Sequence, residues 1–210
     1  MQRHPKRVFC VRHGESTGNL GGAEWINPPL TPRGRLQARR LQEALKHISF
    51  DHAYISPLDR ARDSFAESGL YAAQMHLDSR ITEYTPDPQD YASMVPYTDY
   101  LEGVKDDAHN AWLVPYRERV PAFLNDLIAL PAHNVLVMAH GGFLSTLLQY
   151  FLAANCEDYR DSIPHNCGIG VIEIGTTPRT DRLLVWNDVR HLTGVLSQEP
   201  LSAFDDSVKA

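Results

Sequence analysis

The 210-residue sequence predicts an α/β fold, namely a three-layer α/β/α sandwich with a mainly parallel central sheet. Short apolar runs typical of buried strands alternate along the chain with longer segments whose apolar residues recur at helical spacing. Such an alternation lets successive strands run parallel while the connecting helices cover both faces of the sheet. No repeat, low-complexity tract or linker interrupts the chain. Residues 1–210 are therefore predicted to form a single domain, with a candidate lid insert at about 84–112.

The first strand and helix are predicted from local signals. Val8–Val11 is a short run of the buried-strand type. A helix is predicted over about 32–47, because Thr31 suits the N-cap and Pro32 suits the first helical position. Its expected core face consists of Leu36, Leu41, Leu45 and Ile48.

The remaining elements continue the alternation. Ala53–Ile55 is the next predicted strand, and a second helix should follow it with Ser56 as N-cap and Pro57 next. The later predicted elements are a helix over about 114–130, the strand Val135–Ala139, a helix from about Phe143 to Ala154, and a closing hairpin of Gly168–Ile174 and Leu183–Trp186.

The composition narrows the functional classes. Apolar residues make up 43% and charged residues 22% of the chain, as in soluble globular proteins, and no apolar run is long enough to cross a membrane. The N-terminal segment lacks the apolar core of a secretory signal, and the three cysteines show no CxxC spacing, so a cytoplasmic protein is expected. The net charge of −6 argues against nucleic acid as a partner. The excess of basic residues within 1–62 indicates a local anion site.

Three predicted strands end in residues that suit phosphate chemistry. The first ends in Arg12-His13-Gly14, the second leads through Ser56 into Arg60, and the strand at 135–139 is followed by His140-Gly141-Gly142. Sites in parallel sheets lie at the carboxyl ends of the strands, so these side chains are expected to meet at one edge. A lone histidine after an apolar run is usually structural. Two histidines flanked by glycine, with arginines nearby, favour a functional site.

These residue types are suited to phosphoryl transfer. Arginine binds phosphoryl oxygens with two donors and neutralises the charge that develops during transfer. A neutral imidazole can attack phosphorus and form a covalent phosphohistidine. A second, cationic histidine would hold the equatorial oxygens. A carboxylic acid would protonate the leaving alkoxide and then activate water.

Four segments occur in an order that is similar to that of a known family. They are Val8–Asn19, which contains RHGES, Leu30–Ala38, which contains LTPRG, Ser56–Ala61, which reads SPLDRA, and Val135–Gly142, which ends in HGG. Together they resemble the motifs of the histidine phosphatase (phosphoglycerate mutase-like) superfamily. The resemblance extends from residue 8 to about 150 and implies a phosphoglycerate mutase-like fold.

The resemblance implies a role for each matching residue. His13 matches the histidine that accepts the phosphoryl group. Arg12, Arg60 and His140 match the other members of the phosphate pocket, and Asn19 matches the polar residue that often completes it. The family needs no cofactor. The ten histidines show no HxH or HExxH spacing, so no metal site is expected either.

The general acid is the least closely matched residue. The family often places it in an LxE segment, which Ile81-Thr82-Glu83 matches about twenty residues beyond Arg60. The glycine and tryptophan that usually follow are replaced by residues 84–88. Glu83 is therefore predicted as the catalytic acid, with Asp87 and Asp90 as alternatives.

Several other residues have more than one interpretation. Glu15 is expected either at the pocket entrance or as a surface acid, and Arg62 is expected to pair with a surface acid, since it does not share a helical face with Arg60. Cys10 should be an inert core thiol, and Cys167 is expected near the pocket rim. The aromatic residues of the insert would either cover the pocket or pack over the sheet; they are Tyr91, Tyr97, Tyr100 and Trp112.

The sequence thus predicts a metal-independent phosphomonoester hydrolase that acts on a small phosphorylated substrate through a phosphohistidine on His13. A phosphomutase of the same family is one alternative, although the chain is short for it and has Gly22-Ala23-Glu24 where glycolytic mutases carry a Thr-Gly pair. A non-catalytic module that binds a phosphorylated ligand is the other, because the acid is uncertain. The sequence names neither the substrate nor the oligomeric state, for which a homodimer is one option.

Overall fold

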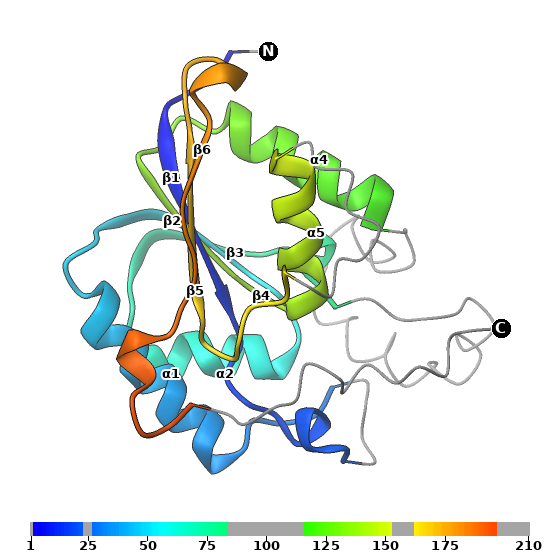
Figure 1. The fold of residues 1–210 in the computed structure, drawn as a ribbon, viewed down its shortest axis with the longest axis vertical. Coiled ribbons are helices and arrows are strands. Elements are labelled where there is room, and N and C mark those ends of the chain that lie inside the picture. Colours follow the sequence, from blue (N-terminus) through cyan, green and yellow to red (C-terminus); the bar gives the residue numbers. More distant parts are fainter. Residues whose placement is uncertain (1, 23–26, 84–115, 153–161, 197–210) are drawn as a thin grey trace, which may run out of the picture.

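The computed structural model describes residues 2–22, 27–83, 116–152 and 162–196, which form a six-stranded sheet flanked by helices (Figure 1). The strands lie in the order β3-β2-β4-β1-β5-β6. Their bounds are β1 Lys6–Arg12, β2 Phe50–Ile55, β3 Ala72–Leu77, β4 Asn134–Ala139, β5 Ile169–Ile174 and β6 Arg182–Asp188. The strands β3, β2, β4 and β1 run parallel, and β5 pairs antiparallel with both β1 and β6. The predicted mainly parallel sheet is confirmed.

Helices cover both faces of this sheet, which confirms the three layers (Figure 1). The helices are α1 Pro32–Leu45, α2 Asp59–Ser68, α4 Tyr116–Ala129 and α5 Gly141–Leu152, and the short 3-10 turns are η1 Thr17–Leu20, η2 Ser79–Ile81, η6 Pro178–Thr180 and η7 Arg190–Leu192. The pair α1 and α2 packs on one face, and the pair α4 and α5 packs on the other.

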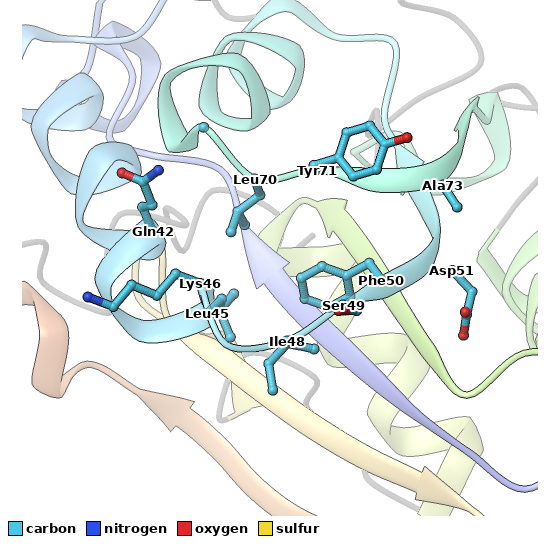
Figure 2. A pocket seen from close by; sticks show the side chains of 11 residues that line it. Gln42, Leu45, Lys46, Ile48, Ser49, Phe50, Asp51, Leu70, Tyr71 and Ala73 are labelled. Atoms are coloured by element: carbon cyan, nitrogen blue, oxygen red, sulfur yellow. The ribbon is translucent and has the colours of Figure 1, made fainter.

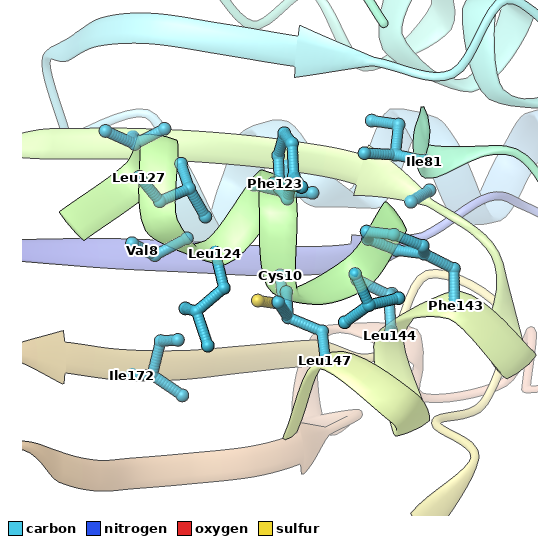
Figure 3. Close-up of a cluster of buried hydrophobic side chains, with 14 of the residues drawn as sticks. Val8, Cys10, Ile81, Phe123, Leu124, Leu127, Phe143, Leu144, Leu147 and Ile172 are labelled. Carbon is cyan, nitrogen blue, oxygen red and sulfur yellow. The ribbon is translucent and has the colours of Figure 1, made fainter. Parts of the chain in front are cut away.

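Strand β1 lies inside the sheet and sends alternate side chains into the two cores. Val8 and Cys10 join the cluster under α4 and α5, in which Phe123 and Phe143 pack edge to face (Figure 3). Phe9 and Val11 join the cluster under α1 and α2. Because β1 is covered on both faces, the residues that follow it are held firmly at the carboxyl edge of the sheet.

Three local predictions were wrong. Strand β3 was not predicted, because its sequence AAQMHL lacks an alternating pattern and most of its side chains are exposed at the sheet edge. Leu36 is 40% exposed, and Gly34, Gln37 and Ala38 lie on the buried face of α1 instead. Helix α2 begins at Asp59 with Leu58 as N-cap, so Ser56 is not the cap.

Other predictions concern segments that the structure does not describe. The candidate lid insert at about 84–112 lies outside the described residues, and so do the alternative acids Asp87 and Asp90 and the third cysteine, Cys156. Within the described ranges, every helix is too short or too polar to cross a bilayer.

Candidate active site

The carboxyl ends of β1, β2 and β4 meet as the sequence predicts. The main-chain N–H of His13 donates to the carbonyl of Ala139 at 3.0 Å, and the N–H of Ser56 donates to the carbonyl of Met138 at 3.0 Å. The imidazole rings of His13 and His140 are consequently neighbours, with their centroids 5.0 Å apart and their planes inclined by 59°. Residues more than 120 positions apart in the sequence are thus neighbours at one edge of the sheet.

The hydrogen bonds of His13 fix its tautomer. Its Nδ1 lies 2.7 Å from the carbonyl oxygen of Gly14, which can only accept, so Nδ1 carries the proton. Its Nε2 then has the lone pair and accepts a hydrogen bond from Nε of Arg60 at 3.3 Å. The His13 side chain is 2% exposed. The arrangement presents Nε2 as a nucleophile beside a guanidinium.

Burial and two arginines lower the pKa of His13 well below its ordinary value, with burial the largest cause, followed by the charges of Arg60 and Arg12. The imidazole is therefore neutral at physiological pH. A neutral ring is required for attack on phosphorus, whereas an imidazolium has no free lone pair. The environment of His13 thus supports nucleophilic chemistry.

Arg12 is the second buried arginine whose charge acts on His13, and its own contacts hold it in place. It is 5% exposed, and its Nη1 donates to the carbonyl of Pro164 at 3.0 Å. A Cβ on Gly141 would lie 3.3 Å from Nε of Arg12, so glycine after His140 leaves room for the guanidinium. Two buried arginines therefore flank one neutral histidine, which is an arrangement that favours a phosphate dianion.

His140 is anchored by a serine that the sequence analysis had assigned to a helix cap. Its Nε2 lies 2.7 Å from Oγ of Ser56, and that oxygen already accepts from the N–H of Leu58 at 3.4 Å. A hydroxyl oxygen has two lone pairs, so Ser56 can accept from Nε2 or donate to it, and donation places the proton of His140 on Nδ1. Among the described residues, no hydrogen-bond partner lies within reach of this buried Nδ1. In that tautomer the Nδ1–H is available to a bound anion.

Burial, Arg60, His13, Arg12 and Arg119 lower the pKa of His140 in that order, well below its ordinary value. In the unliganded protein this histidine is therefore neutral rather than cationic, and the tautomer with its proton on Nδ1 still has a donor there. The positive charge of the site resides on the arginines.

Asn19 supports the loop after β1. Its Oδ1 accepts hydrogen bonds from the main-chain N–H and the hydroxyl of Ser16, each at 2.9 Å. Asn166 donates from Nδ2 to the same oxygen at 3.3 Å and to the carbonyl of His13 at 3.0 Å. Asn19 is thus linked to His13 through Asn166, a residue that the sequence analysis did not single out. Direct contact of Asn19 with phosphate stays a prediction.

Glu15 is a buried residue, so the surface interpretation was wrong. It is 2% exposed and accepts a hydrogen bond from the hydroxyl of Thr31 at 2.7 Å. Thr31 also caps α1 by accepting from the N–H of Gly34 at 3.0 Å. Glu15 therefore ties the loop that carries His13 to the start of α1.

Arg62 pairs with Asp59 at 3.6 Å on the surface, as predicted.

The structure places Glu83 two residues beyond η2, with its main-chain carbonyl 3.4 Å from Nη2 of Arg119. Arg119 was not predicted as a site residue, yet it is 3% exposed and its charge acts on His140. The role of Glu83 as an acid stays a prediction.

The two described cysteines are unsuited to nucleophilic attack. Burial raises the pKa of Cys10 to about 12, and it raises the pKa of Cys167 further above its ordinary value. Cys167 has a φ of 55°, and its N–H donates to the carbonyls of Arg12 and His13 at 3.0 and 3.3 Å. Its role is to support the main chain under the site.

Comparison with known proteins agrees with this geometry. The model of the histidine phosphatase superfamily (branch 1) matches residues 8–189. The chain belongs to this superfamily. It is similar to the adenosylcobalamin/alpha-ribazole phosphatase of Salmonella typhi, with 28% identity over 70% of this chain and 80% of that protein. It is also similar to the phosphoglycerate mutase-like protein AT74H of Arabidopsis thaliana, with 34% identity over 82% of this chain and 75% of that protein.

A solved structure shows the same histidine phosphatase fold. The phosphoserine phosphatase of Entamoeba histolytica, in complex with 3-phosphoglyceric acid, matches with a TM-score of 0.65 and 24% identity. The match covers 89% of this chain and 99% of that chain. At this level of identity the likeness shows the fold alone.

A pocket at the opposite edge of the sheet has a lining without the histidines and arginines of the candidate active site (Figure 2). It has a volume of about 440 Å³ and lies where α1 ends and where β2 and β3 begin. Its charged lining residues are Lys46 and Asp51, and the Asp51 carboxylate accepts from the main-chain N–H groups of His133 and Asn134 at 2.7 and 2.9 Å. His13 and His140 lie at the other edge. Within the described ranges, no group of three His, Cys, Asp or Glu could hold a metal ion.

Proposed function

We propose that this histidine phosphatase superfamily member is a metal-independent phosphomonoester hydrolase that acts through a covalent phosphohistidine on His13. The observation that supports this most directly is the state of His13, whose ring is neutral, protonated on Nδ1 and flanked by two buried arginines. Such a ring has one reactive atom, Nε2. The Salmonella typhi relative is also a phosphatase.

In the proposed first step, Nε2 of His13 attacks phosphorus, and the bond from phosphorus to the substrate oxygen breaks. Arg12, Arg60 and the Nδ1–H of His140 hold the phosphoryl oxygens and stabilise their charge. Glu83, as the carboxylic acid, gives its proton to the leaving oxygen, so that the alcohol departs neutral.

In the second step, a water molecule attacks the phosphoryl group on His13. The Glu83 carboxylate takes the proton from this water, the bond between phosphorus and Nε2 breaks, and inorganic phosphate leaves. The enzyme returns to its starting state with His13 neutral and Glu83 protonated. The arginines supply the positive charge that divalent metals supply in other phosphatases.

The test is turnover of a panel of phosphomonoesters by the purified protein in excess EDTA. We expect undiminished hydrolysis in the chelator, loss of activity in His13→Ala, and retention in His47→Ala, which removes an exposed histidine just after α1. An alkali-stable, acid-labile phosphoprotein should form in the active protein. A strict need for added metal, or normal rates in His13→Ala, would overturn the proposal.

The same assay separates the alternatives. Transfer of the phosphoryl group to an added phosphoglycerate, faster than its release to water, would indicate a mutase. Binding of phosphorylated compounds without turnover would indicate a binding module.

A further inference from the structure

Arg119 is a buried cation that none of the sequence motifs includes. It is the fourth residue of α4 and is 3% exposed. A charged side chain is rarely buried unless its donors are used, because its removal from water is unfavourable. The partners of Arg119 therefore indicate what the residue does.

The described contacts of Arg119 converge on the end of η2. Its Nη1 donates to the carbonyls of Arg80 and Thr82 at 3.1 and 3.0 Å and to the hydroxyl of Thr82 at 2.8 Å. Its Nη2 lies 3.4 Å from the carbonyl of Glu83. The Thr82 hydroxyl in turn donates to the carbonyl of Ser79 at 2.8 Å. One guanidinium thus joins α4 to the main chain of residues 80–83.

This clamp lies close to the phosphate pocket. The charge of Arg119 is among those that lower the pKa of His140, together with Arg60 and Arg12. Helix α4 packs against η2 and against α5, the helix that His140 precedes. Helix α4 thus contacts both the segment that ends in Glu83 and the helix that follows His140.

We propose that Arg119 is a positioning residue, whose guanidinium holds residues 80–83 so that the Glu83 carboxyl stays at the phosphate pocket. This inference rests on the proposed function, in which Glu83 protonates the leaving group. Proton transfer requires the acid within hydrogen-bond reach of the leaving oxygen, so a small shift of this main chain weakens it.

The geometry requires arginine and not merely a positive charge. Donors on two different nitrogens of the planar guanidinium reach acceptors on three residues of the clamp. A lysine would bring one ammonium to the same space and could not span these acceptors. Arg119→Lys therefore keeps the charge and loses the clamp, whereas Arg119→Met loses both.

The experiment compares an alkyl phosphate with p-nitrophenyl phosphate, whose leaving group departs without a proton. In both Arg119→Lys and Arg119→Met we expect kcat for the alkyl phosphate to fall by about 10- to 100-fold. The pre-steady-state burst of nitrophenolate should slow by less than about threefold, because that step does not need the acid. Inhibition by inorganic phosphate should be kept in Arg119→Lys and weakened in Arg119→Met, because only the lysine keeps the charge near His140.

A double variant tests whether Arg119 acts through Glu83. In the Glu83→Gln background, Arg119→Lys should slow the alkyl phosphate no further, since the acid is already absent. Additive losses would overturn the inference, and so would equal slowing of both substrates. If the Arg119 variants do not fold, Thr82→Val removes one acceptor of the clamp and should give a smaller change in the same direction.

Arg35→Met is the matched control. Arg35 belongs to α1, and its guanidinium pairs with Asp63 and Glu67 of α2 at 3.2 and 2.9 Å, without a contact to residues 80–83 among the described interactions. It should lower stability without a difference between the two substrates. A failure of the proposed function appears separately, as a wild-type protein without turnover or an active His13→Ala variant.

Discussion

The Oγ of Ser56, just after β2, lies 2.7 Å from Nε2 of His140, just after β4. When Ser56 donates in this bond, His13 and His140 both carry their proton on Nδ1 but use different nitrogens. His13 uses its unprotonated Nε2 for attack, whereas His140 uses its protonated Nδ1 for donation. The site thus contains two neutral imidazoles, one whose Nε2 accepts from Arg60 and one whose Nδ1 has no hydrogen-bond partner among the described residues.

Replacement of Ser56 by alanine should release His140 from that tautomer. A ring protonated on Nε2 would turn a lone pair toward the phosphoryl oxygens. We expect kcat/KM to fall by about fivefold to tenfold, the equivalent of one hydrogen bond of about 1–1.5 kcal/mol. The nitrogen chemical shifts of His140 should show a change of protonated nitrogen. Ser68→Ala, which loses a bond to the carbonyl of Phe65, is the matched control and should leave both measurements unchanged.

The pKa of His13 should rise when Arg60 loses its charge. Burial and the charges of Arg60 and Arg12 hold this pKa below 6.5, so the ring is neutral and activity persists as pH falls toward that value. In Arg60→Gln the pKa should move up, and the acid limb of kcat/KM should move to higher pH with it. An NMR titration of His13 gives the pKa directly, and the maximal rate should also fall as a phosphate donor is lost.

Arg62→Gln provides the comparison for Arg60→Gln, since Arg62 lies on the same helix and pairs with Asp59 on the surface. The phosphate group of the substrate has a pKa near 6, which affects the pH dependence of kcat/KM equally in both variants. An unchanged His13 titration in Arg60→Gln would contradict the electrostatic explanation.

Most of the fold could be predicted because its signals are local. Thr31 and Pro32 mark the start of α1, and the apolar runs of β1 and β4 mark strands that are covered on both faces. Strand β3 carries no such signal, because at the edge of the sheet its pairing with β2 rather than its side chains determines its structure.

Site residues that directly follow strand ends could be predicted from the sequence. Site residues whose role depends on tertiary contacts could not. His13 and His140 follow adjacent strands, so topology brings them together. Ser56 precedes a helix and resembles a cap in the sequence, and only the position of β4 beside β2 gives it His140 as a partner. Arg119 resembles a surface residue of a helix until η2 packs against it.

The close approach of two main chains beside His13 should make Gly34 intolerant of a side chain. A Cβ at Gly34 would lie 2.0 Å from the carbonyl oxygen of Glu15, and a Cβ at Gly14 would lie 2.4 Å from the carbonyl oxygen of Gly34. Gly34→Ala should lower the free energy of unfolding by about 1–3 kcal/mol through the forced shift, and lower kcat because that shift reaches His13. Leu36→Ala, in the same helix and 40% exposed, should change stability by less than about 1 kcal/mol. Urea unfolding of both variants measures the difference.

The assignment of the general acid to Glu83 can be tested through the dependence of the hydrolysis rate on the leaving group. An alkyl phosphate leaves as a strongly basic alkoxide and needs a proton, whereas nitrophenolate does not. Glu83→Gln should slow alkyl phosphate hydrolysis by about 10²–10⁴-fold and affect the nitrophenolate burst much less.

Phosphohistidine should also accumulate in Glu83→Gln, because the same carboxylate activates water in the second step. Quenching in alkali, where phosphohistidine survives, and measuring the bound phosphate would detect it. Asp87→Asn and Asp90→Asn are the matched carboxyl-to-amide controls and should retain both rates. Equal, small effects of Glu83→Gln on the two substrates would remove Glu83 from the mechanism, and a large leaving-group effect in Asp87→Asn or Asp90→Asn would assign the proton to that residue instead.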